Sequence, residues 1–165
     1  VEVGAALGAE VVAVARGDDR LDAARRAGAR DLIDAEAPDI RDRLRALGGV
    51  DVAFDSVGGA LFDACFRAMR PEGRILVIGF AGGLPEIRPN HLMVKNVSVI
   101  GVYWGGYRDF APEALTGSLA ELMGWHAAGR LAPRVGHVLP LDRAAEGLEL
   151  IRTRRATGKI VVTTG

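Results

Sequence analysis

The chain has 165 residues, enough for one ordinary domain with a sizeable core but too few for two comfortable ones. Its 21 Lys and Arg residues balance its 21 Asp and Glu residues, so the formal net charge is zero and phosphate-backbone or anionic-membrane binding is not expected. No apolar run reaches about 18 residues, and neither a secretory leader nor a pair of cysteines is found. We therefore expect a cytoplasmic protein with no nucleic-acid or membrane partner.

Apolar segments rich in Val and Ile alternate with helical patterns through most of the chain. The predicted strands, in chain order, are residues 10–15, 31–34, 50–54, 74–78 and 97–103. Four of these five are too continuously apolar to be half-exposed. The predicted helices cover residues 18–28, 38–47, 60–70, 112–129 and 142–154, and a last strand covers 159–163. This alternation predicts an α/β protein with a doubly wound parallel sheet covered on both faces.

The first residues suggest that the sheet is incomplete. The chain opens on Val1 rather than Met, and its first eight residues are typical of a helix end that stops at Gly8. The usual Gly-x-Gly-x-x-Gly loop would lie before that point. We expect a Rossmann sheet of order 3-2-1-4-5-6 without its first strand and glycine-rich loop, so that the second and fourth strands lack their shared neighbour.

Glycines cluster where the strands predicted at 50–54 and 74–78 end. Gly58 and Gly59 follow the first of these, and Gly79, Gly82 and Gly83 follow the second. In open parallel sheets, ligands bind outside the carboxyl ends of the strands, where glycine lets the backbone approach closely. The pattern predicts a ligand site at this edge, and the alternative is that these are ordinary loop glycines.

Two arginines follow the strand at 10–15, where NAD-binding proteins normally carry an acidic residue. Arg16 ends the strand and Arg20 lies one turn into the next helix. Guanidinium groups there suit a ribose 2′-phosphate, which favours NADP over NAD. The alternative is that both are solvated surface side chains.

The other reactive side chains are weaker candidates. Cys65 shares a helical apolar pattern with its neighbours, which favours a packed core thiol over a nucleophile. The three histidines have no metal-ligand spacing, and no hydrolytic triad is supported. Asp55 is either a ligand contact or the cap of the following turn. Tyr103 and Trp104 either stack near a cofactor or serve a core or interface role.

Four segments in this order and spacing carry a family resemblance: residues 50–59, 73–80, 96–104 and 156–159. Together they resemble the medium-chain dehydrogenase/reductase superfamily, and within it the zinc-free NADPH:quinone oxidoreductases related to zeta-crystallin. The resemblance implies a GroES-like catalytic domain upstream of Val1. It also implies that residues 1–130 form the dinucleotide-binding domain and that 131–165 return to the catalytic domain.

The resemblance also implies the cofactor contacts. They fall at Arg16, Gly17, Arg20, Gly59, Ile78, Gly79, Phe80, Ala81, Tyr103, Trp104, Gly105 and Arg155. Residues 78–81 match a segment along the nicotinamide ribose, 103–105 match contacts near the carboxamide, and Gly59 lies on the adenine side. At Ala35 many family members place Tyr or His against the adenosine, so here the arginines carry more of that role.

These expectations define one function and its rivals. We expect the coenzyme-binding part of an NADPH-dependent oxidoreductase that transfers a hydride to a quinone or activated alkene, inactive as this polypeptide alone, with no metal. Strand 97–103 resembles one that pairs with its twin in a homodimer. The alternatives are a zinc-dependent alcohol dehydrogenase, an enoyl-thioester reductase, a non-catalytic nucleotide-sensing or dimerisation module and, least favoured, a methyltransferase-type domain.

Overall fold

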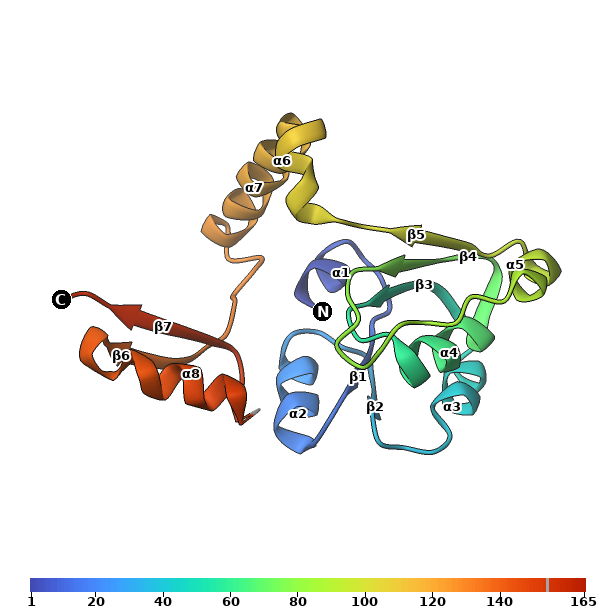
Figure 1. Cartoon of the computed structure of the whole chain (residues 1–165), viewed down its shortest axis with the longest axis horizontal. Helices are drawn as coiled ribbons and strands as arrows, with labels where there is room; N and C mark the ends of the chain where they lie inside the picture. Colours follow the sequence, from blue (N-terminus) through green and yellow to red (C-terminus); the bar gives the residue numbers. More distant parts are fainter. Residues whose placement is uncertain (154) are drawn as a thin grey trace. The chain divides into compact units, whose positions relative to one another are not determined.

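A computed structural model describes residues 1–153 and 155–165 of the chain. The chain forms two compact units, drawn together in Figure 1. Unit 1 comprises residues 1–32 and 119–165, and unit 2 comprises residues 33–118. Among the described residues, no helix is both long enough and apolar enough to cross a membrane.

Unit 2 is built on a three-stranded parallel sheet. Its strands are β3 (Val50–Asp55), β4 (Met69–Val77) and β5 (Ser98–Gly101), with β4 in the middle (Figure 1). Asp55 lies opposite Val77, and Val77 lies opposite Gly101. The three carboxyl ends therefore line up along one edge of the sheet, as the glycine clusters predicted for the first two.

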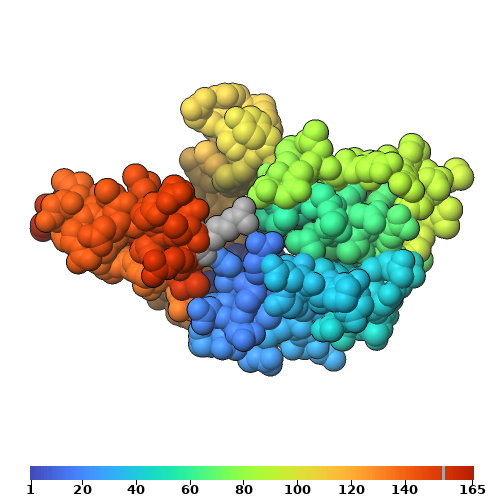
Figure 2. All heavy atoms as spheres, turned by 60° about the horizontal axis from the view of Figure 1, so that its bottom comes forward, coloured from blue at the N-terminus to red at the C-terminus, as the bar shows by residue number. Residues whose placement is uncertain are grey.

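The core of unit 2 lies between this sheet and the helices that connect its strands. α4 (Gly59–Ala68) contributes Phe62 and Phe66, which are almost fully buried with their ring centroids 5.5 Å apart. They pack with Met69 and Ile75 of β4, the latter without any exposed surface. α3 (Ile40–Ala46) lies against α4, and Figure 2 shows the two segments side by side. α5 (Pro89–Lys95) adds Leu92 to the edge of this core.

The opposite side of β3 is largely exposed, which contradicts the expectation that continuously apolar strands are covered on both faces. Ala53 and Asp55 are buried, whereas Val52 is 53% exposed and Phe54 is 71% exposed. Phe54 lies opposite Leu76, which lies opposite Ile100, so these side chains form an apolar row across the sheet. The prediction of a strand from these apolar residues is confirmed, but the prediction that both of its faces are buried is wrong.

The fourth predicted strand is longer than expected. The prediction placed a helix to residue 70 and a strand from 74, but α4 ends at Ala68 and β4 begins at Met69. Pro71 disfavours helical geometry in the residue before it, so the chain is already extended there. A register shift between Val50 and Val52 accommodates the extra residues, and Glu72 has φ 63°.

Unit 1 contains the first elements of the chain and its tail. α1 (Glu2–Ala6), β1 (Val12–Ala15) and α2 (Asp18–Arg26) follow the predicted order, and β1 pairs with β2 (Asp31–Asp34) in a two-stranded sheet. β1 and β3 belong to different sheets. The interruption falls where the strand order 3-2-1-4-5-6 predicts an absent first strand, which confirms the doubly wound α/β assignment with this gap.

The tail forms a second small sheet in unit 1. β6 (Val135–Pro140) pairs in parallel with β7 (Lys159–Thr163), and α8 (Ala144–Arg152) connects them (Figure 1). The prediction for residues 142–154 is correct for this helix, although its predicted end at Arg154 lies outside the described residues. β6 was not predicted, because its two ends carry Gly and Pro signals that favour a connection.

Helix ends differ in detail from the predicted ranges. α7 (Pro112–Ala127) ends before the predicted residue 129. α3 ends at Ala46, one residue before the predicted end, and Leu47 is 46% exposed. The N-cap of α2 is Gly17, and Asp18 and Asp19 lie in its first turn. The short helices η1 (Trp104–Gly106), α6 (Tyr107–Phe110) and η2 (Leu141–Arg143) complete the fold.

Candidate cofactor-binding site

Two loops leave the carboxyl ends of β3 and β4 side by side and are joined through their backbones. The first loop comprises residues 55–59 and the second comprises residues 78–83. The Ile78 amide donates to the Asp55 carbonyl at 2.7 Å, and the Gly82 amide donates to the Val57 carbonyl at 2.6 Å. We call this pair of loops the strand-end loops. Because they are tied to each other and to β3 and β4, they present a fixed backbone surface.

Asp55 holds the first loop in shape. Its side chain is buried, and one carboxylate oxygen accepts hydrogen bonds from the Val57 and Gly58 amides at 2.9 Å each. The other oxygen accepts from the Gly58 amide at 3.1 Å. A buried carboxylate needs such partners, since burial without them is costly. Of the two roles left open for Asp55, the structure shows the capping role.

Glycine is required at the first loop for two reasons. Gly58 has φ 72° and ψ −157°, a conformation almost restricted to glycine. A Cβ atom at Gly58 would overlap the carbonyl oxygen of Gly83, and a Cβ at Gly59 would lie 2.7 Å from the carbonyl oxygen of Gly82. These positions are therefore not ordinary loop glycines, because their missing side chains let the two loops approach.

The segment after β5 brings exposed aromatic side chains to the same edge of the sheet. The Val102 amide donates to the Val77 carbonyl at 3.0 Å, so this segment starts beside the second strand-end loop. Tyr103 is 77% exposed and Trp104 is 47% exposed, while the Trp104 ring contacts Tyr107 at 5.1 Å between centroids. A role in the core of unit 2 is thus wrong for Tyr103.

The structure gathers one group of predicted site residues in unit 2. Gly59 and residues 78–81 belong to the strand-end loops, and residues 103–105 follow the neighbouring strand. Phe80 is 52% exposed, so an aromatic side chain is available on the second loop as well. The Val57 carbonyl, which joins the loops, was not predicted, because a backbone carbonyl leaves no residue-specific signal in a sequence.

A second group lies at the end of β1 in unit 1. Gly17 has φ 79° and begins α2, where its carbonyl accepts from the Arg20 amide at 3.2 Å. The Arg20 guanidinium reaches back to the Arg16 carbonyl at 3.3 Å. The Arg20 side chain therefore lies against the Arg16 backbone at the first turn of the helix. Ala35 directly follows β2.

Arg155 lies past the end of α8 in unit 1. Its amide donates to the Leu150 carbonyl at 2.9 Å, and its side chain is exposed. Its charge is one of the influences that lower the pKa of Glu149, after the hydrogen bond from Arg152. These contacts tie Arg155 to the helix, and its predicted role at the cofactor stays a prediction.

Cys65 has the properties of a packed thiol. It lies on α4 against the core of unit 2, and burial, with the nearby Asp55 charge, raises the pKa of its thiol to about 11. The thiolate is the reactive form, so a nucleophilic role is disfavoured at neutral pH. Among the residues that the structure describes, no group of three or more His, Cys, Asp or Glu side chains could hold a metal ion. This chain therefore offers zinc no ligand set of its own within those residues.

Parallel strand ends with glycine-rich loops, interrupted where a first strand would lie, define a Rossmann-type coenzyme-binding domain. The family described as zinc-binding dehydrogenase matches residues 1–119, which is more than half of the chain. The chain belongs to this family.

Individual relatives agree with this assignment. Bovine quinone oxidoreductase-like protein 2 is 34% identical over 161 residues, which are 95% of this chain and 46% of that protein. Bovine prostaglandin reductase-3 is 33% identical over 132 residues, which are 69% of this chain and 34% of that protein. The chain thus spans about half the length of the first of these relatives and a third of the second.

Solved structures show the same fold. A probable oxidoreductase from Mycobacterium abscessus superposes with a TM-score of 0.83 at 27% identity, covering 99% of this chain and 49% of that one. CurA from Vibrio vulnificus, solved in complex with NADPH, superposes with a TM-score of 0.74 at 26% identity, covering 99% of this chain and 52% of that one. An NAD-dependent alcohol dehydrogenase superposes with a TM-score of 0.80 at 29% identity, covering 99% and 46%.

Proposed function

We propose that this chain is the coenzyme-binding part of an NADPH-dependent oxidoreductase that reduces a quinone or an activated alkene. The observation that carries the proposal is the aligned carboxyl edge of β3, β4 and β5. There the strand-end loops offer backbone groups, Phe80 is exposed on the second loop, and the exposed Tyr103 and Trp104 follow β5. This edge is where open parallel sheets bind nucleotides.

Each predicted contact has a role in this proposal. Residues 78–81 and 103–105 would hold the nicotinamide end, and Gly59 the adenine side. Arg16, Gly17 and Arg20 would hold the 2′-phosphate, since guanidinium groups form charge-assisted hydrogen bonds with phosphate oxygens. Arg155 would add a further positive charge. When bound, NADPH supplies the hydride from its nicotinamide ring, and the residues of this chain supply orientation.

The names of the relatives support the substrate class. Quinone oxidoreductase-like protein 2 names a quinone, and CurA was solved with NADPH. A second candidate is an alcohol dehydrogenase reaction, which the NAD-dependent alcohol dehydrogenase among the similar structures favours. Arg16 and Arg20, which follow β1, favour NADPH over NADH as the cofactor of this chain.

The test is a comparison of the two nicotinamide cofactors in the protein that carries this chain. Fluorescence titration should give tighter binding of NADPH than NADH. Arg16→Gln should weaken NADPH binding about tenfold or more and leave NADH binding nearly unchanged, because one charged hydrogen-bond partner of the phosphate is lost. Arg26→Gln, on the same helix, is the control. Equal affinities for the two cofactors would overturn the NADPH assignment.

Metal dependence, assembly and location are parts of the same proposal. We propose that hydride transfer needs no metal, so a chelator should leave the rate unchanged, and that the protein is a cytoplasmic homodimer. β5 lies at the edge of its sheet, which supports pairing between two copies. Sedimentation should give twice the monomer mass. The 165-residue polypeptide alone should bind NADPH weakly and not turn over.

A further inference from the structure

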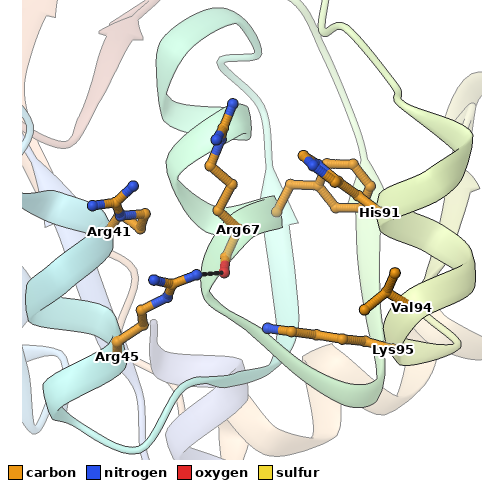
Figure 3. Close-up of a pocket in the computed structure, with 7 residues that line it drawn as sticks. Arg41, Arg45, Arg67, His91, Val94 and Lys95 are labelled. Carbon is orange, nitrogen blue, oxygen red and sulfur yellow. Dashed lines mark hydrogen bonds between the residues drawn. The ribbon is translucent and has the colours of Figure 1, made fainter.

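A basic depression lies in unit 2, among α3, α4 and α5. Its volume is about 180 Å³, and it is lined by Arg41, Arg45, Phe66, Arg67, His91, Val94 and Lys95. Figure 3 shows the Arg45 and Lys95 side chains extending into it from opposite sides. We call it the α3–α5 depression. None of its lining residues belongs to the strand-end loops or to the group after β1.

Among the described residues, two of its cations form ion pairs with carboxylates and two do not, although the Arg45 charge also helps to lower the pKa of the Asp42 carboxyl, after the hydrogen bond from Arg41. Arg41 is paired with Asp42 at 2.9 Å, and Arg67 with Asp63 at 2.9 Å. Within the described part of the chain, Arg45 and Lys95 have backbone carbonyls as their polar partners. The Arg45 guanidinium donates to the Arg67 carbonyl at 3.0 Å, and the Lys95 ammonium donates to the Met69 carbonyl at 2.7 Å.

These two contacts leave most of the donors unused. Both accepting carbonyls lie at the end of α4, where cations stabilise a helix, so a purely structural role for the two side chains is the competing explanation. A guanidinium has five N–H donors and an ammonium three. Each side chain can therefore keep its carbonyl contact and still donate to a ligand.

The remaining wall is apolar and aromatic. Phe66 lines the depression and is nearly buried, and the His91 ring lies 5.7 Å from the Phe66 ring between centroids. Val94 is 75% exposed at the rim. The depression is smaller than the roughly 300–1,000 Å³ of pockets for drug-sized ligands, so it suits a small anion with a compact organic part.

We propose that the α3–α5 depression binds a phosphate group, free or carried by a small organic molecule. Arg45 offers paired donors to two phosphate oxygens, and Lys95 offers a point charge opposite it. Phe66, His91 and Val94 border the organic part. This site is separate from the proposed NADPH site, and it holds or fails independently of the proposed function.

The experiment titrates phenyl phosphate, inorganic phosphate and poly-glutamate into the protein that carries this chain, with and without saturating NADPH. Backbone NMR shifts should move in α3, α5 and the end of α4, and NADPH should not displace the probe. Tighter binding of phenyl phosphate than of inorganic phosphate identifies an ester as the ligand, and equal binding identifies free phosphate. Displacement by NADPH, or binding of poly-glutamate with neither phosphate probe bound, overturns the proposal.

Variants separate binding from structure. Arg45→Gln and Lys95→Gln should each weaken phenyl phosphate binding about tenfold. Val94→Glu places a carboxylate at the exposed rim and should weaken it at least as much without unfolding the protein. Met93→Glu is the matched control, because Met93 is 76% exposed on the same helix but does not line the depression. Equal affinities for Val94→Glu and Met93→Glu would overturn the proposal.

Discussion

The end of β3 and the end of β1 are both strand ends with a glycine, yet they are built differently. At β3 the loop is closed: Gly58 meets the backbone of Gly83, and the buried Asp55 carboxylate fixes the turn. At β1 the loop is open, because a Cβ at Gly17 would meet nothing within 4 Å. The distinctive groups there are the charged side chains of Arg16 and Arg20. Backbone shape therefore defines the first strand end, and side-chain charge defines the second.

Because of this difference, substitutions at the two strand ends should affect different properties, namely folding stability at β3 and ligand binding at β1. Substitution in a closed backbone loop must change the folded structure, because no side chain can move aside. Substitution of an exposed charge removes an interaction with a ligand and costs the fold little. Variants at the β3 end should thus report mainly on folding, and variants at the β1 end mainly on the cofactor.

Gly58→Ala should have the largest effect. The alanine would adopt a conformation almost restricted to glycine and would overlap the Gly83 carbonyl, so we expect a loss of about 3 kcal/mol or more in the free energy of unfolding. Urea denaturation measures it. Gly124→Ala is the control, because Gly124 lies within α7 with open space around it. This variant should raise the free energy of unfolding by about 0.5–1 kcal/mol. If Gly58→Ala left the free energy of unfolding unchanged, the two loops would not be in close contact at Gly58.

Asp55→Ala should lower the free energy of unfolding, measured by urea denaturation, by about 2–3 kcal/mol. The reason is that the amides of Val57 and Gly58 lose their acceptor in a buried turn. Asp55→Asn should cost less, since its amide oxygen can still accept. Asp34→Ala is the matched control, because Asp34 accepts the Glu36 amide at 2.7 Å in an exposed turn and should cost about 0.5 kcal/mol. Equal losses at Asp55 and Asp34 would contradict the role given to burial.

The burial of Cys65 on α4 predicts a pH dependence of the free energy of unfolding. Its folded pKa of about 11 exceeds the ordinary value of 9.0, so the unfolded state loses the thiol proton first. The contribution of Cys65 is therefore fully present below pH 9 and is lost between pH 9 and about 11. Relative to Cys65→Ala, the wild-type free energy of unfolding should fall by about 2–3 kcal/mol across that interval. A difference that does not change with pH would mean that the thiol is solvated.

Arg20→Gln should have the smallest effect on stability, within about 0.5 kcal/mol, because its hydrogen bond to the Arg16 carbonyl is exposed. Thermal or urea unfolding checks this value. The same variant should weaken NADPH binding if the proposed function is correct. A large loss of stability would show that the β1 end is also held by structure, and the contrast with the β3 end would fail.

Much of the fold follows from patterns that are local in sequence. Helix ends at Gly8 and Gly28, the strand at 31–34 and the separation of β1 from β3, where a first strand would lie, are all confirmed. Proline and glycine decide these boundaries through their own backbone preferences. The helix predicted to residue 70 is wrong at its end, because Pro71 disfavours helical geometry in the residue before it and Met69 pairs with Val50 of β3.

The candidate site was predictable only in outline. Glycine clusters and strand ends located the strand-end loops, and the two arginines after β1 were found from their position in the chain. The contact between Gly58 and Gly83 was not predictable, because it joins residues in two loops. The exposure of Phe54 was not predictable either, because it depends on which face of the sheet the helices cover.

The sequence by itself determined the order of the elements, the interrupted doubly wound sheet and the family. These depend on residue periodicity and on the backbone preferences of glycine and proline, which act over a few positions. Only the tertiary structure decided that Asp55 is a cap, that the strand-end loops are locked together and that Arg45 and Lys95 face one depression. Those features depend on distances between separate segments, and such distances exist only once the strands have paired.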